Sequence, residues 1–226
     1  MKSKKTLIVF DIDGTLTDTV PLHKSAFVQA LTQLGVKEVD TNFNAYKHHT
    51  DYHIAKTIYE KDTGLSFDTK LESIFEDFLF NIIHEGSFSE ISGAQQMIAA
   101  LEADTDTGIC YATGSLLRPA VCKLQRTGIN FMPLQIAASN GVETRENIVQ
   151  TAIQQAKAFY EQDHFERIIS IGDGLWDLLT ARNLELEFIG IGALHQQLLA
   201  EHGATLHFRD WQGFHPGLLL PHIADA

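Results

Sequence analysis

Hydrophobic residues gather in short continuous runs along much of the chain. Six such runs, rich in β-branched residues, occupy 6–10, 108–113, 134–139, 167–172, 187–192 and 204–208. Continuous apolar runs of this length are typical of strands that are covered on both faces. From residue 92 onward these runs alternate with segments in which apolar residues recur every three to four positions. The alternation predicts an α/β fold, with a Rossmann-like parallel sheet and helices on both of its faces.

One long interval breaks this alternation. Residues 20–89 contain no convincing strand, and three segments there have helical spacing, at 21–35, 51–64 and 67–86. Each of the three ends in a glycine, the residue that most often terminates a helix. We therefore expect an all-helical cap domain at 20–89, inserted into a core domain that is formed by residues 1–19 and 90–226.

Composition narrows the class of protein. The chain has 226 residues and a net charge of −12, which argues against nucleic-acid and membrane partners because both require a basic surface. Two cysteines do not make a disulfide framework, and the apolar run near the N-terminus is too short for a signal peptide or a membrane span. His195 and the later histidines, up to His222, are interpreted as surface or loop residues. We expect a cytoplasmic protein that is a monomer or a weak homodimer.

Two carboxylates stand directly after the first predicted strand, in the stretch LIVFDIDGTLTDT. Like charges as close as Asp11 and Asp13 are costly unless a cation lies between them. In parallel sheets ligands bind beyond the carboxyl ends of the strands. Other polar residues that follow predicted strands or precede the next helix are Thr113, Gly114, Arg145, Asp173 and Asp177. Because Mg²⁺ takes carboxylates, waters and substrate phosphate as ligands, these residues predict a magnesium site at this edge of the sheet.

A calcium loop of the EF-hand type is an alternative for the DIDGT stretch. That loop requires a Glu at its twelfth position, and the twelfth position counted from Asp11 is Leu22. The calcium alternative therefore fails.

The motifs together resemble those of the haloacid dehalogenase-like (HAD) phosphohydrolases. The resemblance is carried by DIDGTLTDT, by the apolar run that ends in Thr113, and by IGDGLWD. It covers nearly the whole chain and includes the helical cap after the first motif, as in phosphoglycolate phosphatase-like and β-phosphoglucomutase-like members. D-x-D-G-T after one strand, paired with G-D-x-x-x-D after a later one, is a specific signal.

The resemblance implies a role for each motif residue. Asp11 would be the nucleophile and a Mg²⁺ ligand, and Asp13 would be the general acid and base, with its backbone carbonyl on the metal. Thr113, with Gly114, would bind the phosphoryl group. Asp173 would be a metal ligand, and Asp177 would complete the acidic cluster.

The basic residue of the site departs from the family pattern. The family usually has a lysine before the last motif, whereas the best-placed basic residue here is Arg145. Arginine binds phosphate but differs from lysine in reach and geometry. Lys123 and Lys157 are alternatives, and both are interpreted as surface positions on helices.

The cap stretch AYKHHTDYHIAK holds candidate substrate-binding residues. In similar enzymes this part of the cap faces the active site, which implies substrate contacts for four residues: Lys47, His48, His49 and Thr50. A polar loop in which Thr50 or Asp51 caps the next helix is an equal alternative, and both interpretations can hold together.

These observations predict a Mg²⁺-dependent phosphatase that hydrolyses a small phosphorylated metabolite through an aspartyl-phosphate. Three alternatives stay open: a phosphomutase, a phosphonate hydrolase that uses a cap lysine such as Lys47 or Lys56, and a catalytically silent phosphate- or metal-binding module. Carbon–halogen hydrolysis is disfavoured, because the dehalogenase branch lacks the second acid, which is present here as Asp13.

Overall fold

The sheet has the architecture that the apolar runs predict. The computed structural model describes residues 3–214 and Gly217, and among these residues six strands form one sheet in the order β3-β2-β1-β4-β5-β6. Every neighbouring pair is parallel. The strands are β1 (Thr6–Phe10), β2 (Thr107–Ala112), β3 (Ile136–Ala137), β4 (Arg167–Gly172), β5 (Glu187–Ile191) and β6 (His207–Phe208). The predicted α/β, Rossmann-like fold is confirmed.

The two edge strands are shorter than the apolar runs at 134–139 and 204–208. Each edge strand pairs with one neighbour only, β3 with β2 and β6 with β5, and each pairing covers two residues. Pro133–Gln135 forms a 3₁₀ turn instead of extending β3. Hydrophobicity marks the position of an edge strand, whereas the extent of pairing sets its length.

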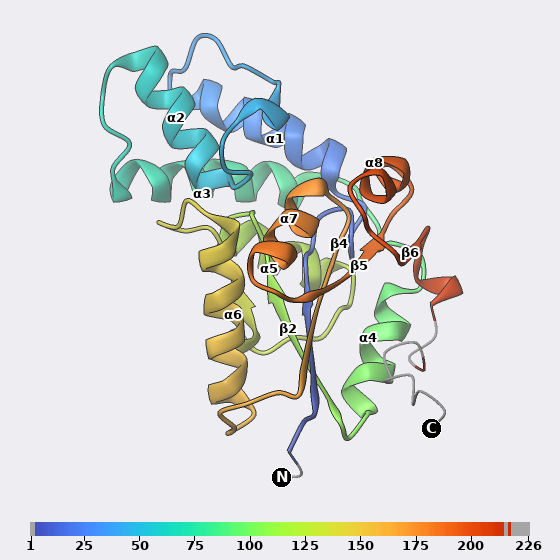
Figure 1. The fold of residues 1–226 in the computed structure, drawn as a ribbon. Helices are drawn as coiled ribbons and strands as arrows, with labels where there is room; N and C mark the ends of the chain where they lie inside the picture. The colour runs from blue at the N-terminus through green and yellow to red at the C-terminus, as the bar shows by residue number, and fades with distance from the viewer. Residues whose placement is uncertain (1–2, 215–216, 218–226) are drawn as a thin grey trace, which may run out of the picture.

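Different helices cover the two faces of the sheet (Figure 1). Side chains alternate along β1, so Ile8 and Phe10 join a cluster with the apolar residues of α4, while Leu7 and Val9 join a cluster with those of α6. Both clusters are buried, as the two-sided burial of the runs requires. The core helices are α4 (Ala94–Ala103), α5 (Leu117–Arg126), α6 (Arg145–Phe159), α7 (Leu175–Asn183) and α8 (Gln196–Glu201).

The inserted helices form a separate apolar cluster above the sheet. They are α1 (Val20–Gln33), α2 (Asp51–Thr63) and α3 (Thr69–Glu85), with a 3₁₀ turn at Phe43–Ala45. Edge-to-face contacts join Phe27 to Phe43 and to Phe75 at the centre of this cluster. Figure 1 shows these helices over the carboxyl end of the strands.

The chain leaves the core and returns to it through two adjacent segments. The Asp18 amide donates to the Ser89 carbonyl at 2.9 Å, and Thr17 is bridged to Glu90. This arrangement supports a core of 1–19 and 90–226 with a cap at 20–89, and that division stays a prediction.

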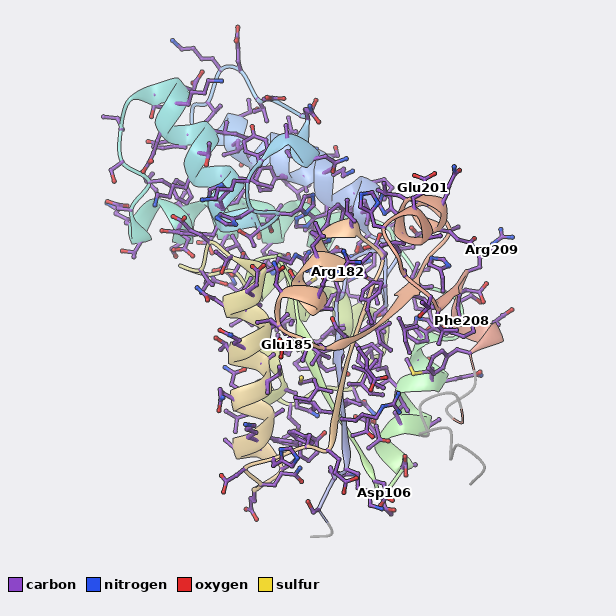
Figure 2. The ribbon with its side chains drawn as sticks, viewed as in Figure 1. Asp106, Arg182, Glu185, Glu201, Phe208 and Arg209 are labelled. Atoms are coloured by element: carbon purple, nitrogen blue, oxygen red, sulfur yellow. The ribbon has the colours of Figure 1, made fainter. Side chains whose placement is uncertain are left out.

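The far end of the sheet is distant from the cap. Asp106, which precedes β2, lies at this end in Figure 2, opposite to the cap helices. The carboxyl ends of the strands, where ligands bind in such sheets, therefore face the cap. Among the described residues, no helix combines the length and apolarity needed to span a bilayer.

Candidate active site

The loop after β1 fixes the two predicted acids at the end of the sheet. The Asp11 amide continues the ladder by donating to the Ile171 carbonyl at 2.9 Å, so Asp11 stands where the strand ends. Gly14 follows with a φ of +80°, and a Cβ at this position would collide with the carboxylate of Asp173. Only glycine satisfies both the backbone conformation and the close approach of the two loops.

Arg145 is the basic residue that reaches Asp11. Its Nη1 donates to Asp11 Oδ1 at 3.0 Å and to Asp177 Oδ1 at 2.9 Å, and its Nε donates to the His49 carbonyl at 3.1 Å. Arg145 is the first residue of α6, where the helix dipole disfavours a cation. The two carboxylates therefore determine its position, and they raise the pKa of Arg145 against the opposing effect of burial.

Three carboxylates form a compact buried cluster. Oxygens of Asp11, Asp173 and Asp177 lie within 4.8 Å of one another. Asp173 Oδ1 is buried without a hydrogen-bond partner in the described part of the chain, a costly condition for a charged oxygen. Asp177, in the first turn of α7, accepts from the Gly174 amide at 3.1 Å. This donor set, with one oxygen unused, fits a hard divalent cation.

The cluster perturbs the protonation of its own members. Burial raises the pKa of Asp11 to about 7, helped by the charge of Asp177 and opposed by Arg145. Burial likewise raises the pKa of Asp177 to about 6, although Arg145 opposes it. Burial also raises the pKa of Asp173. Arg145 alone does not compensate the three carboxylates, so a second cation would lower the pKa of each.

Asp13 has a different partner, Lys123 of α5. The Lys123 ammonium lies 2.7 and 2.8 Å from the two Asp13 carboxylate oxygens, and the Thr19 hydroxyl also donates to Asp13. Burial would raise the pKa of Asp13, but the charge of Lys123 and the hydrogen bonds from Lys123 and Thr19 outweigh it and lower the pKa to about 2. Asp13 is therefore ionised near neutral pH.

The prediction that Lys123 lies at the surface is wrong, because its side chain is 0% exposed. The sequence holds a signal for this: Leu116, Ala120 and Leu124 are fully buried, and Lys123 lies seven positions after Leu116, on the same face of the helix. A lysine on an apolar helix face needs a buried acid as its partner. The sequence does not show that Asp13 is this acid, because only the folded structure brings Asp13 next to Lys123.

A small cavity of about 90 Å³ lies between the acids and the cap. The predicted site residues that line it are Asp11, Asp13, Thr113, Gly114, Arg145, Asp173, His49 and Thr50. Lys47 and His48 line an adjacent, larger cavity of about 540 Å³ instead. Thr50 also caps α2, accepting from the His53 amide, and its hydroxyl donates to the Glu143 carbonyl. The substrate-binding roles of these four cap residues stay predictions.

A stacked pair of rings lines both cavities. The rings of His49 from the cap and Trp176 from α7 lie 3.7 Å apart and 3° from parallel, and both residues line both cavities. Burial and the charge of Arg145 lower the pKa of His49 to about 3, so its ring is neutral near neutral pH. Sequence reasoning left Trp176 unassigned, since nothing in GDGLWD shows which face of α7 meets the cap.

His195 is a second site residue that sequence reasoning missed. His195 lies in a loop, as the sequence indicates, but its Nδ1 lies 3.0 Å from the Asp173 carbonyl oxygen and its side chain lines the small cavity. The Asp173 carboxylate, whose Oδ2 lies 3.6 Å from the same nitrogen, raises the pKa of His195, and burial opposes this. The residue precedes a short helix and has no motif around it, so only the fold brings it to the acids. His222 lies outside the described residues.

Comparison with known proteins places the chain in a family. The profile of the haloacid dehalogenase-like hydrolases matches residues 8–191, and the chain belongs to this family of hydrolytic enzymes. The comparison with curated proteins gave no match.

Solved structures show the same fold at low sequence identity. CbbY from Rhodobacter sphaeroides in complex with phosphate has a TM-score of 0.72 at 18% identity, covering 92% of this chain and 95% of that one. A HAD hydrolase from Entamoeba histolytica has a TM-score of 0.70 at 16% identity, with coverages of 94% and 96%. A hydrolase from Pseudomonas syringae has a TM-score of 0.61 at 20% identity, with coverages of 91% and 93%. A mutant of CbbY was solved in complex with xylulose-(1,5)bisphosphate.

Proposed function

We propose that this protein is a Mg²⁺-dependent phosphatase that hydrolyses a small phosphorylated metabolite through an aspartyl-phosphate. The observation that carries the proposal is the pair of acids after β1. Asp11 forms an ion pair with Arg145 and lies beside two further carboxylates, whereas Asp13 forms an ion pair with Lys123. In this proposal Asp11 is the nucleophile, Asp13 is the proton-transfer group, and the carboxylates around Asp11 form the cation site, all at one small cavity. Structures of similar fold that hold phosphate or a sugar bisphosphate support the phosphoryl chemistry.

The first step transfers the phosphoryl group to Asp11. Arg145 holds Asp11 Oδ1 at 3.0 Å, which orients the carboxylate, while Oδ2 has only a long contact of 3.4 Å from the Thr15 hydroxyl. Oδ2 attacks phosphorus, the bond from phosphorus to the ester oxygen breaks, and Asp13 gives its proton to the leaving oxygen. Asp13 is ionised without substrate, and the negative charge of an entering phosphate raises its pKa so that it takes up this proton.

The second step regenerates the enzyme. Asp13, now ionised, takes a proton from a water that attacks the phosphorus of the aspartyl-phosphate. The bond between phosphorus and Asp11 Oδ2 breaks, phosphate leaves, and Asp11 is a carboxylate again. Thr113 and Gly114, beyond the end of β2, line the cavity where the phosphoryl oxygens bind.

The carboxylates of Asp11 and Asp173, with the Asp13 backbone carbonyl, would hold Mg²⁺. Asp177 accepts from both Arg145 and the Gly174 amide, so it orients the arginine beside the cluster. The cation would supply positive charge that offsets the repulsion between these acids and an anionic substrate.

Phosphate release from a panel of small phosphomonoesters, with Mg²⁺ and after chelation, tests the proposal. We expect release that requires Mg²⁺. Conversion of a sugar 1-phosphate to the 6-phosphate without free phosphate would indicate a mutase. Absence of both reactions in folded, Mg²⁺-bound protein would indicate the silent binding module.

The stabilising effect of Mg²⁺ is expected to grow with pH. The pKa values of Asp11 and Asp177, about 7 and 6, lie above their ordinary value of 3.8, so the metal-free folded protein loses stability as pH rises from about 4 to 7. Mg²⁺ binds the ionised carboxylates and reverses that loss. Thermal melts with and without an excess of Mg²⁺ should show a larger rise in Tm at pH 8 than at pH 5, because a ligand that binds only the folded state stabilises it. Asp13, with a pKa of about 2, does not change charge in this interval.

Asp173→Asn is the variant that locates the effect, because it removes one ligand of the cluster while keeping the shape of the side chain. We expect it to lose most of the Mg²⁺-dependent rise at pH 8. A rise that is equal at the two pH values, or that survives in Asp173→Asn, would place the bound cation elsewhere.

Trp176→Ala is expected to relax the size limit on the leaving group. The stacked rings of His49 and Trp176 line both the cavity of about 90 Å³ and the cavity of about 540 Å³, so we expect removal of the indole to join the two. The ratio of kcat/KM for a bulky phosphomonoester to that for a small one should rise at least about 10-fold, the effect typical of a few methylene volumes in a pocket. Leu179→Ala, which changes only the larger cavity, is the control. An equal rise in both variants would contradict the role of the stack.

A further inference from the structure

Lys123 is a fully buried cation whose donors are all accounted for. Its ammonium lies 2.8 Å from Asp13 Oδ2, 2.9 Å from His23 Nδ1 and 3.3 Å from Ser115 Oγ. Three acceptor groups thus match its three N–H groups, since both oxygens of the Asp13 carboxylate lie within reach, Oδ1 at 2.7 Å. An ammonium cannot accept a hydrogen bond, so His23 Nδ1 must accept. Nε2 of this neutral ring then carries the proton and donates to Asp51 Oδ1 at 2.9 Å.

The four side chains form one chain of hydrogen bonds across the domain boundary. Asp51 at the start of α2 and His23 of α1 belong to the cap, whereas Lys123 of α5 and Asp13 belong to the core. Asp51 also forms two hydrogen bonds with the core directly. Its amide donates to the Gly114 carbonyl at 2.7 Å, and its Oδ2 accepts from the Leu116 amide at 3.2 Å. Seating of the cap and the position of Lys123 are therefore parts of one network.

We propose that Lys123 is a positioning residue that couples seating of the cap to the placement of the Asp13 carboxylate. This inference rests on the proposed function, because it assigns a partner to the acid and base of that reaction. With the cap seated, His23 and Ser115 fix the ammonium, and the ammonium fixes Asp13. When the cap lifts, the ammonium loses the His23 acceptor and Asp13 loses its fixed partner. Asp13 can therefore transfer a proton only while the seated cap closes the site from bulk water.

Arg126 supplies the matched control on the same helix. Its Nη1 donates to the cap carbonyls of Ile83, His84 and Gly86, at 3.2, 2.8 and 2.8 Å. Like Lys123, it fastens the cap to α5, but it has no contact with Asp13. A variant of Arg126 therefore reports what loosening the cap does by itself.

The first experiment compares Lys123→Met with Arg126→Met in the full-length protein. Misplacing a catalytic group costs on the order of 10²-fold, so Lys123→Met should lower kcat by about 10²-fold and change KM by less than about 3-fold. Arg126→Met should keep kcat within about 3-fold of the wild type. Equal losses in the two variants would overturn the proposal in favour of general loosening of the cap.

Lys123→Met leaves the Asp13 carboxylate without a counter-charge, which can prevent folding. A second pair of variants keeps Lys123 and changes His23 instead. Leucine and asparagine have the same shape, but only asparagine offers an acceptor near the place of His23 Nδ1. His23→Leu should lower kcat by about 10-fold or more, and His23→Asn should recover most of that loss. The same loss in both variants, with folded protein in each case, would overturn the proposal.

Hydrogen exchange separates this inference from the proposed function. The Leu116 amide is held by Asp51, so its exchange should become at least about 10-fold faster in His23→Leu than in the wild type or His23→Asn. A wild type that releases no phosphate would refute the phosphatase, while faster exchange would still support the link between the cap and Lys123. Unchanged exchange in His23→Leu would overturn the link whatever the activity.

Discussion

Asp11→Asn is expected to abolish turnover, with a loss in kcat of about 10⁴-fold or more, as removal of a covalent nucleophile typically causes. The carboxamide keeps the shape of the side chain but cannot attack phosphorus. The change also removes a buried charge that its neighbour Asp177 destabilises, so without Mg²⁺ the variant should melt at or above the wild-type temperature. Initial rates of phosphate release and thermal melts measure the two effects.

Asp18→Asn is the control for Asp11→Asn. Asp18 is an acid of the same loop, but its side chain is exposed, so the change should leave kcat within about 2-fold of the wild type, as is usual for surface substitutions. Substantial turnover in Asp11→Asn would refute the aspartyl-phosphate mechanism. Loss of turnover with a collapsed thermal transition would instead show that Asp11 is structural.

Arg145→Met is expected to lower kcat by about 10²- to 10³-fold, the typical effect of removing one charged donor from a transition state. The guanidinium touches the nucleophile, Asp177 and the His49 carbonyl together, so its loss both releases Asp11 and weakens the contact with the cap. Arg145→Lys should recover part of the rate, because a single ammonium can hold Asp11 but cannot reproduce the fork. Steady-state kinetics of the two variants measure this.

Lys157→Met is the control for Arg145→Met, since it removes a cation from the same helix. Lys157 lies in the last turn of α6, twelve residues and about 18 Å along the helix from Arg145. It should have no effect on kcat. A loss in Lys157→Met with none in Arg145→Met would reverse the assignment and restore the alternative that the sequence left open.

The two chemical tasks of the proposed reaction, nucleophilic attack and proton transfer, have separate counter-charges in this protein. Arg145 is shared between Asp11 and Asp177, so burial and the charge of Asp177 still raise the pKa of Asp11 to about 7. Asp13, two residues away, has Lys123 as its partner, which lowers the pKa of Asp13 to about 2. A difference of this kind between neighbouring carboxylates is how active sites assign different roles to the same residue type. The separation depends on which helix brings each cation, α6 or α5.

Local sequence was sufficient where the signal is a period or a run. The apolar runs of β1, β2, β4 and β5 are strands because a sheet covered on both faces requires apolar residues at successive positions. Caps were equally local: Asp68 accepts from the Leu71 amide at the start of α3, and Gly64 adopts a φ of +70° at the end of α2. Hydrogen bonds between near neighbours in the chain determine such features, so single residues predict them.

The acids of the site were predictable for a related reason. Parallel strands end at one edge of a sheet, so residues that follow strands meet there whatever the rest of the fold does. This rule predicts that Asp11, Asp173 and Asp177 lie close together, and in the structure their oxygens lie within 4.8 Å of one another. Arg145 reaches them from the start of the helix that follows β3.

Side-chain contacts between distant segments of the chain follow no such rule. The burial of Lys123 against Asp13 and the approach of His195 to Asp173 each join two segments of the core, and the stacking of Trp176 on His49 joins the core to the cap. Tertiary packing decides these contacts, and no period or motif encodes that packing locally. The amino-acid sequence alone therefore predicts the sheet, the inserted helices and the acids of the site. The partner of each acid and the limits of the cavity depended on the tertiary structure, because they arise from contacts between segments that are distant in the chain and meet only in the folded protein.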